Sequence, residues 1–123
     1  AAASAHRLAR PPAAGELASC YFADNDLIAI GAMKALQKSG YRIPRDIAII
    51  GFDNLPMGDY LEPSLTTIHV PKQYMGEMAA RRLMDVLGAK RFVPVKLEIS
   101  TNLLRRRSVS EARTSTMVSV SLH

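Results

Sequence analysis

The stretch Ile-Ala-Ile-Ile-Gly-Phe-Asp, residues 47–53, decides the fold of this chain. Its first six residues are apolar or small, and no polar residue alternates with them, as expected for a strand covered on both faces. Strands of that kind lie inside parallel sheets that are flanked by helices. In open α/β sheets, ligands bind just beyond the carboxyl ends of the strands. We therefore predict that Asp53 contacts a ligand, with a turn-forming or capping role as the alternative.

Two elements precede this strand and complete a β–α–β unit. Residues 19–23 predict a short strand, and residues 27–38 predict a helix that is apolar around most of its girth. Asn25 lies at the helix start, where its amide either caps the first turn or binds a ligand hydroxyl. Asp26 is expected to cap the helix, and Phe22 either stacks on a ligand ring or packs in the core. The predicted fold class is α/β, built from parallel βαβ units.

The second half of the chain alternates irregular and regular segments. Prolines and glycines in residues 54–63 leave room for one helical turn, and residues 65–70 predict a strand. Residues 71–87 carry apolar side chains at spacings of three and four, which predicts an amphipathic helix. Residues 92–99 are a strand candidate with an irregular start, and residues 102–106 are a further short one.

Composition excludes several classes of protein. The 123 residues carry a formal net charge of +5, but residues 17–104 hold ten Lys and Arg against nine Asp and Glu, so the excess lies in the two ends. That distribution favours solvated basic tails over a DNA-binding face. The single cysteine, Cys20, cannot form an internal disulfide. No stretch predicts an export signal or a membrane span, so we expect a cytoplasmic protein.

No constellation of residues predicts catalysis, a metal site or a cofactor. No two His or Cys residues have metal-ligand spacing, and no serine lies in a nucleophile-elbow pattern. Asp59 and Glu62 lack a neighbouring nucleophile or histidine, which favours surface charge over an acid/base pair. His69 is interpreted as structural, and residues 105–107 as arginines on the outside of the last strand rather than as phosphate contacts. An enzyme is therefore not expected.

Five motifs in register give the chain a family resemblance. Residues 23–31 (Ala-Asp-Asn-Asp-Leu-Ile-Ala-Ile-Gly), 40–53 (Gly-Tyr-Arg-Ile-Pro-Arg-Asp-Ile-Ala-Ile-Ile-Gly-Phe-Asp) and 63–68 (Pro-Ser-Leu-Thr-Thr-Ile) are followed by the small residues of the second helix and by Arg106-Arg107-Ser108. Over residues 22–109 this order resembles the C-terminal part of the LacI/GalR transcription regulators. The resemblance implies a truncated lobe of the periplasmic-binding-protein-like type I fold, with residues 71–87 belonging to the other lobe.

The resemblance also implies functions for particular residues. A sugar or related small-molecule effector binds between the two lobes of such domains, and the matching positions here are Asp53, Asn25 and Phe22. Family members bind DNA as dimers through an N-terminal helix-turn-helix, which has no counterpart in these residues. The positions that match the family's dimer interface, with burial inside the subunit as the alternative, are Ile30, Met33, Lys34, Tyr60 and Leu61.

The domain limits follow from where the resemblance holds. We interpret residues 1–18 as a linker or non-family remnant, residues 19–109 as a partial effector-binding domain, and residues 110–123 as a disordered tail. The expected function is therefore that of a fragment of the sensing domain of a transcription regulator, with DNA contact only through a further domain. The alternative is a periplasmic sugar-binding protein of an ABC transporter, which shares the fold.

Overall fold

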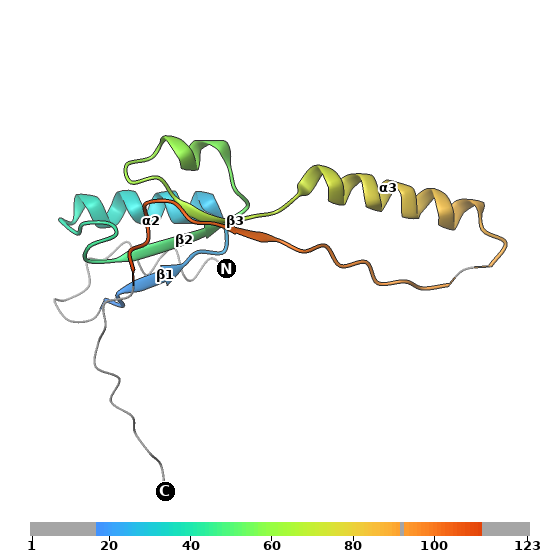
Figure 1. Ribbon diagram of the computed structural model, residues 1–123, viewed down its shortest axis with the longest axis horizontal. Helices are drawn as coiled ribbons and strands as arrows, with labels where there is room; N and C mark the ends of the chain where they lie inside the picture. The colour runs from blue at the N-terminus through green and yellow to red at the C-terminus, as the bar shows by residue number, and fades with distance from the viewer. Residues whose placement is uncertain (1–16, 92, 112–123) are drawn as a thin grey trace, which may run out of the picture.

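A four-stranded sheet in the order β1-β2-β3-β4 forms the centre of the computed structural model, which describes residues 17–91 and 93–111 (Figure 1). The first three strands are parallel, and β4 pairs antiparallel with β3. This arrangement confirms the predicted α/β class. The strands are β1 (Cys20–Phe22), β2 (Ala48–Phe52), β3 (Thr66–His69) and β4 (Asn102–Leu104).

Helix α2 (Asp26–Lys38) connects β1 to β2, as the caps in the sequence predict. The Asn25 side chain accepts a hydrogen bond of 2.9 Å from the backbone N–H of Ile28, which satisfies one free donor of the first turn. At the other end Gly40 adopts φ +87°, and the N–H of Tyr41 donates back to the carbonyl of Leu36. A left-handed residue with such a 6→1 bond is a Schellman ending.

The hydrophobic core lies between α2 and one face of the sheet. Ala29, Met33 and Leu36 of the helix are buried together with Ile49 of β2. Burial along β2 alternates, with Ile49 and Gly51 buried and Ala48, Ile50 and Phe52 half-buried. The prediction that both faces of this strand are covered is therefore wrong within the described residues. The sequence of a continuous apolar strand is the same whether or not other elements of the protein cover the second face of the sheet.

The short connection after β2 contains a 3₁₀ helix, η1 (Pro56–Tyr60), which confirms the predicted helical turn between prolines. β3 and β4 lie inside the ranges predicted for them. None of the helices in the described part of the chain is long and apolar enough to cross a membrane.

Helix α3 (Lys72–Gly88) projects away from the sheet, and residues 93–101 return beside it in an extended form without regular pairing (Figure 1). The strand candidate at residues 92–99 is therefore wrong over its described part. Its neighbour is a helix, which offers side chains rather than a backbone edge, and Arg82 donates to the carbonyl of Val93 at 2.7 Å. We call α3 and residues 93–101 together the arm.

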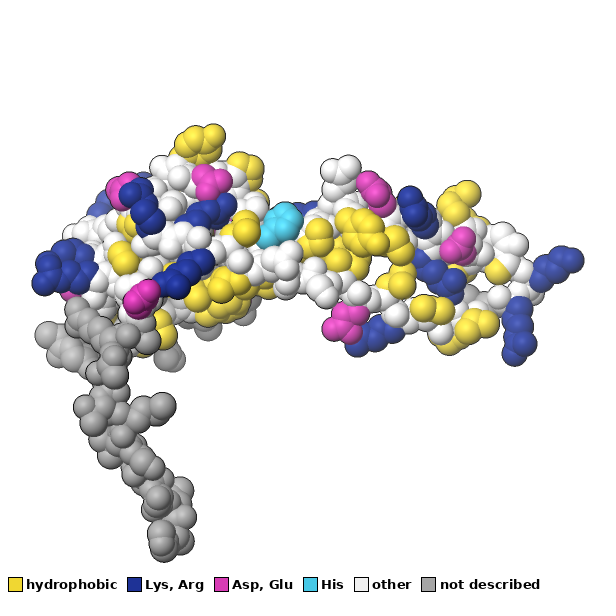
Figure 2. Space-filling view, viewed as in Figure 1, with side chains coloured by type: hydrophobic (Ala, Val, Ile, Leu, Met, Phe, Trp, Pro, Cys, Tyr) yellow, Lys and Arg dark blue, Asp and Glu magenta, His cyan; other side chains and the backbone are white. Residues whose placement is uncertain are grey.

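The arm carries many exposed apolar side chains. No residue of α3 is buried, although its apolar stripe follows the predicted helical spacing. Figure 2 shows apolar side chains gathered between α3 and the returning segment. The large apolar residues exposed on the arm are Tyr74, Met75, Leu83, Met84, Leu87, Val93, Val95 and Leu97.

Candidate ligand-binding site

Asp53 follows the last residue of β2 and lies in a sharp turn. Its N–H donates to the carbonyl of Ile68 at 2.9 Å, which extends the pairing with β3 by one bond. Its φ is +109°, and that of Asn54 is +54°. Residues other than glycine seldom adopt positive φ, and Asn and Asp do so most readily. The turn thus places a carboxylate at the C-terminal edge of the parallel strands.

Lys72, the first residue of α3, holds this aspartate. Its Nζ donates to the Asp53 carbonyl oxygen at 3.1 Å and lies 3.5 Å from Oδ1 of the same residue. The two side chains are 52% and 33% exposed, so the carboxylate remains open to solvent. An exposed ion pair of this kind is weak enough for a ligand to compete with it. Sequence reasoning missed Lys72, because it lies 19 positions away and in a different element.

Phe22 and Asn25 lie at the same edge as Asp53, since β1 pairs in parallel with β2 and Phe22 is the partner of Ile50. Phe22 is 61% exposed, so the alternative that it packs in the core is wrong. Asn25 caps α2 through its side-chain oxygen, which is the structural role predicted for it. No hydrogen bond or ion pair joins the side chains of Phe22, Asn25 and Asp53 to one another, and their role toward a ligand stays a prediction.

Asp26 is fully buried and is the hub of a hydrogen-bond network. Its Oδ1 accepts from the Thr67 hydroxyl at 2.6 Å, and its Oδ2 accepts from the N–H of Leu55 at 2.7 Å. The prediction that Asp26 caps α2 is therefore wrong, because Asn25 makes the cap. A Cβ on Gly51 would lie 2.2 Å from Asp26 Oδ1, so glycine is needed beneath the carboxylate. The network fixes the turn that presents Asp53.

Arg106 ties the C-terminal segment to the lobe. Its guanidinium pairs with Asp59 and donates to the carbonyl of Leu65 and to Oδ1 of Asn54, while its N–H donates to the Thr66 hydroxyl. Its side chain is only 15% exposed. The prediction that all of residues 105–107 point outward is thus wrong for this arginine. Asp59 is exposed, as predicted, but it serves as the partner of Arg106.

Two further polar groups complete this framework. Asn54 Nδ2 lies 3.1 Å from Nδ1 of His69, a structural contact that agrees with the role predicted for the histidine. The buried Ser108 hydroxyl donates to the carbonyl of Ile49 at 2.6 Å and accepts from the N–H of Thr66 at 2.8 Å. Arg106 and Ser108 therefore hold residues 106–108 against β2 and β3.

The residues predicted for a dimer interface divide into two groups. Met33 is 3% exposed and belongs to the core, so its assignment to an interface is wrong. Met33 lies on the face of α2 that packs against the sheet. Because the helix is apolar on most sides, its sequence does not show which face that is. Ile30 and Leu61 are half-buried against the core, and Lys34 and Tyr60 are exposed. These four stay predictions.

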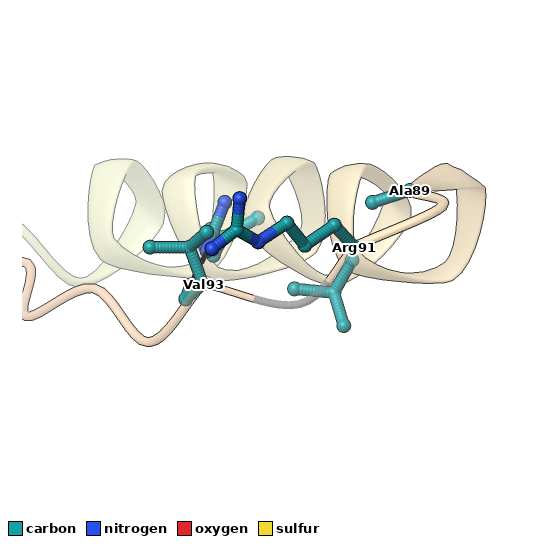
Figure 3. Close-up of a pocket in the computed structure, with 5 residues that line it drawn as sticks. Ala89, Arg91 and Val93 are labelled. Atoms are coloured by element: carbon teal, nitrogen blue, oxygen red, sulfur yellow. Dashed lines mark hydrogen bonds between the residues drawn. The ribbon is translucent and has the colours of Figure 1, made fainter.

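A pocket in the described chain lies elsewhere, on the arm. It is lined by residues of α3 and of the segment after it, as Figure 3 shows; they are Arg82, Val86, Ala89, Arg91 and Val93. Arg82, in the middle of α3, holds the segment after the helix through the Val93 carbonyl. The pocket contains none of the residues predicted to bind a ligand. No cluster of three His, Cys, Asp or Glu suited to a metal occurs among the described residues.

Beyond the site, one carboxyl group has a perturbed pKa. Hydrogen bonds from the Arg42 guanidinium, and then from its backbone N–H, hold the pKa of Asp46 below its ordinary value of 3.8. A lowered folded-state pKa stabilises the fold above the unfolded value, and this contribution disappears as the pH falls through the lowered pKa. The stabilisation that the Arg42–Asp46 contact gives is therefore lost only below pH 3.8.

We expect Arg42→Ala to raise the pKa of Asp46 most of the way to its ordinary value, because the backbone N–H remains as a donor. An NMR titration of the Asp46 side-chain carbonyl carbon measures it. Arg45→Ala is the matched control, since it removes an equal charge that acts on Asp46 only through space. Equal rises of the Asp46 pKa in the two variants would contradict the assignment of the lowered pKa to hydrogen bonds from Arg42.

In an open, mostly parallel sheet, the C-terminal edge of the strands is where ligands bind, and the polar side chains of this chain lie at that edge. A family described as a periplasmic binding protein-like domain matches residues 2–109. The HTH-type transcriptional repressor PurR of Yersinia pestis (strain Pestoides F) is 42% identical over 90 residues, which are 73% of this chain and 26% of that protein. The PurR of Escherichia fergusonii has the same identity and coverage.

Solved structures give the same result. The transcriptional regulator CelR in complex with cellobiose has a TM-score of 0.70 at 34% identity, over 73% of this chain and 28% of that one. A LacI family regulator from Enterococcus faecium with bound ribose has a TM-score of 0.72 at 32% identity, over 80% and 37%. The chain belongs to the periplasmic binding protein-like domain family, and the relatives named here are transcription regulators.

The comparisons bear on the predicted limits and on the alternative function. The chain spans about a quarter of the length of the curated relatives it matches. The family match begins at residue 2, so it includes most of the segment that we interpret as a linker or non-family remnant, and it ends at residue 109. The relatives are transcription regulators rather than enzymes or transporter components, so a periplasmic sugar-binding protein is not favoured.

Proposed function

We propose that this chain contributes the C-terminal lobe of an effector-sensing domain that controls a DNA-binding domain outside these residues. The observation that carries the proposal is the solvent-open carboxylate of Asp53 at the C-terminal edge of the parallel strands. A carboxylate in that position accepts hydrogen bonds from ligand hydroxyls. The effector is a sugar or a related small molecule, as the relatives with bound cellobiose and ribose suggest.

The lobe has the parts that such sensing requires. Asp53 accepts from hydroxyl groups, the amide of Asn25 adds a donor, and the exposed ring of Phe22 offers a face for stacking on a sugar. The arm leads to the second lobe, so a ligand that bridges both lobes favours the closed arrangement. It shifts the equilibrium only by the difference between its affinities for the two states.

The protein acts as a homodimer in the cytoplasm under this proposal. The four residues that remain available for the interface, Ile30, Lys34, Tyr60 and Leu61, come from α2 and from the end of η1. Tyr60 is 89% exposed, so its ring is accessible to a second subunit. DNA contact is made by the helix-turn-helix of the longer regulator.

The ligand proposal predicts weak but site-specific sugar binding by the chain. In a ¹⁵N NMR titration with D-ribose and with cellobiose, we expect shift changes at Phe22, Asn25 and Asp53. Asp53→Asn should weaken the binding of the preferred sugar by about tenfold or more, because a charge-assisted hydrogen bond contributes about 1.5–3 kcal/mol. Asp85→Asn, an equal charge change on the exposed side of α3, should leave it unchanged.

Two outcomes count against the proposal. Shift changes that avoid the edge of the sheet, or an Asp53→Asn variant that binds as tightly as the unmodified chain, would remove Asp53 from the site. The absence of any binding of both sugars at high concentration would reject the sugar as ligand class.

A further inference from the structure

The turn at Asp53 and the start of the arm are joined by contacts that cross between the two parts of the molecule. Lys72 Nζ reaches both the carbonyl oxygen and the carboxylate of Asp53. On the same turn, Asn54 donates its N–H to the Thr67 hydroxyl at 3.3 Å, and its side-chain amide meets His69. Two residues of β3 and the first residue of α3 therefore all hold residues 53–54.

Lys72 is placed to control the direction of α3. Within the described chain, α3 has no buried residue, so side-chain packing against the sheet does not fix its direction. Only residues 70–71 separate β3 from α3, and the N–H of Lys72 donates to the carbonyl of Val70 at 2.8 Å. The contact from Lys72 to Asp53 is thus a non-covalent attachment of the first turn of the helix, in addition to the chain connections at its two ends.

The length of α3 amplifies any change at this attachment. Its 17 residues make a rod about 25 Å long, so a rotation of about 10° at Lys72 moves the far end by about 4 Å. A small change in how Lys72 meets Asp53 therefore becomes a displacement that a distance measurement resolves.

We propose that Lys72 is a positioning residue that holds Asp53 at the ligand edge and couples that carboxylate to the orientation of the arm. When the Lys72 contact is made, the backbone of Asp53 is anchored in its positive-φ turn and α3 keeps one direction. When a ligand takes the carboxylate, Lys72 loses part of its contact and α3 reorients. The ligand role of Asp53 rests on the proposed function, whereas the anchoring of α3 does not.

The experiment measures the distance from the sheet to the far end of α3 by electron spin resonance. Cys20, the only cysteine of the sequence, is exposed on β1 and takes one nitroxide label. Gly88→Cys takes the other, because a Cβ at Gly88 meets nothing within 4 Å. The measurement is made on this doubly labelled chain without sugar, and again after Lys72→Met, Lys72→Arg or Asp53→Asn.

We expect one narrow distance distribution in the unmodified chain, and a broadened, shifted one after Lys72→Met. Asp53→Asn should shift the distribution in the same direction by less, because the carbonyl contact of Lys72 remains. Lys72→Arg, which keeps the positive charge at this position, should keep the narrow distance distribution of the unmodified chain. Lys96→Met is the matched control: Lys96 also lies on the arm in an exposed ion pair, 3.4 Å from Glu98, and its loss should change nothing.

The outcomes separate this inference from the proposed function. A Lys72→Met distribution that matches those of the unmodified chain and of Lys96→Met overturns the positioning role, even if the sugar titration succeeds. A shifted distribution in a chain that binds neither sugar supports the role of Lys72 and rejects the proposed ligand.

Discussion

Gly51→Ala is expected to destabilise the lobe by about 3 kcal/mol or more, since the added methyl group has no space. Its Cβ would lie 2.2 Å from Oδ1 of Asp26 and 3.1 Å from Cδ2 of Leu65. The carboxylate cannot move aside, because Thr67 and Leu55 both bind it. Either β2 shifts away from α2 or the buried hydrogen bonds break.

Urea denaturation followed by circular dichroism measures this loss. Gly31→Ala in α2 is the matched control, because a Cβ there meets nothing within 4 Å. In a helix interior that exchange should stabilise by up to about 1 kcal/mol. An unfolding midpoint for Gly51→Ala at or above that of the unmodified chain would show that the carboxylate does not occupy this space.

Asp26→Ala is expected to cost about 3 kcal/mol, the second large effect. It leaves the N–H of Leu55 and the hydroxyl of Thr67 inside the protein without their acceptor, and an unsatisfied buried donor costs about 1–3 kcal/mol. Asp24→Ala, an equal truncation at an exposed position two residues earlier in the chain, should change stability by no more than about 0.5 kcal/mol.

A double-mutant cycle with Thr67→Val tests whether the effect acts through the network. If Asp26 works by accepting from Thr67, the loss of the hydroxyl should matter less once the carboxylate is gone, with a coupling of about 0.5 kcal/mol or more. Strict additivity of the two changes would contradict the hydrogen bond as the cause.

The β1–α2–β2 unit could be predicted from sequence because its signals are local. The Asn25 cap, the left-handed Gly40 and the apolar strand each act within a few residues, so their meaning does not depend on the rest of the fold. The edge position of Asp53 follows from the same unit, since a parallel strand ends where ligands bind.

The interior of the site could not be predicted, because it depends on residues brought together from distant positions. From the sequence, Asp26 looks like an ordinary helix-start residue. Its role is seen only once the pairing of β2 with β3 places Thr67 beside Gly51, where the Thr67 hydroxyl reaches the Asp26 carboxylate. Lys72 looks like a solvated residue until the direction of α3 is known. The extended part of residues 93–99 has β-type composition, but a strand needs a neighbouring backbone edge, which sequence does not supply.

The antiparallel pairing of β4 with β3 has a consequence for the order of folding. Residues 70–101 separate the two strands, so their pairing closes a loop about as long as a quarter of the chain. Ser108, which bridges β2 and β3, closes nearly the same loop when it docks. Because closure entropy grows only with the logarithm of length, doubling the excursion adds about 0.6 kcal/mol. The lobe therefore tolerates large variation in the length of the arm. The lobe is complete only when residues 102–108, which follow the arm, have docked on β2 and β3.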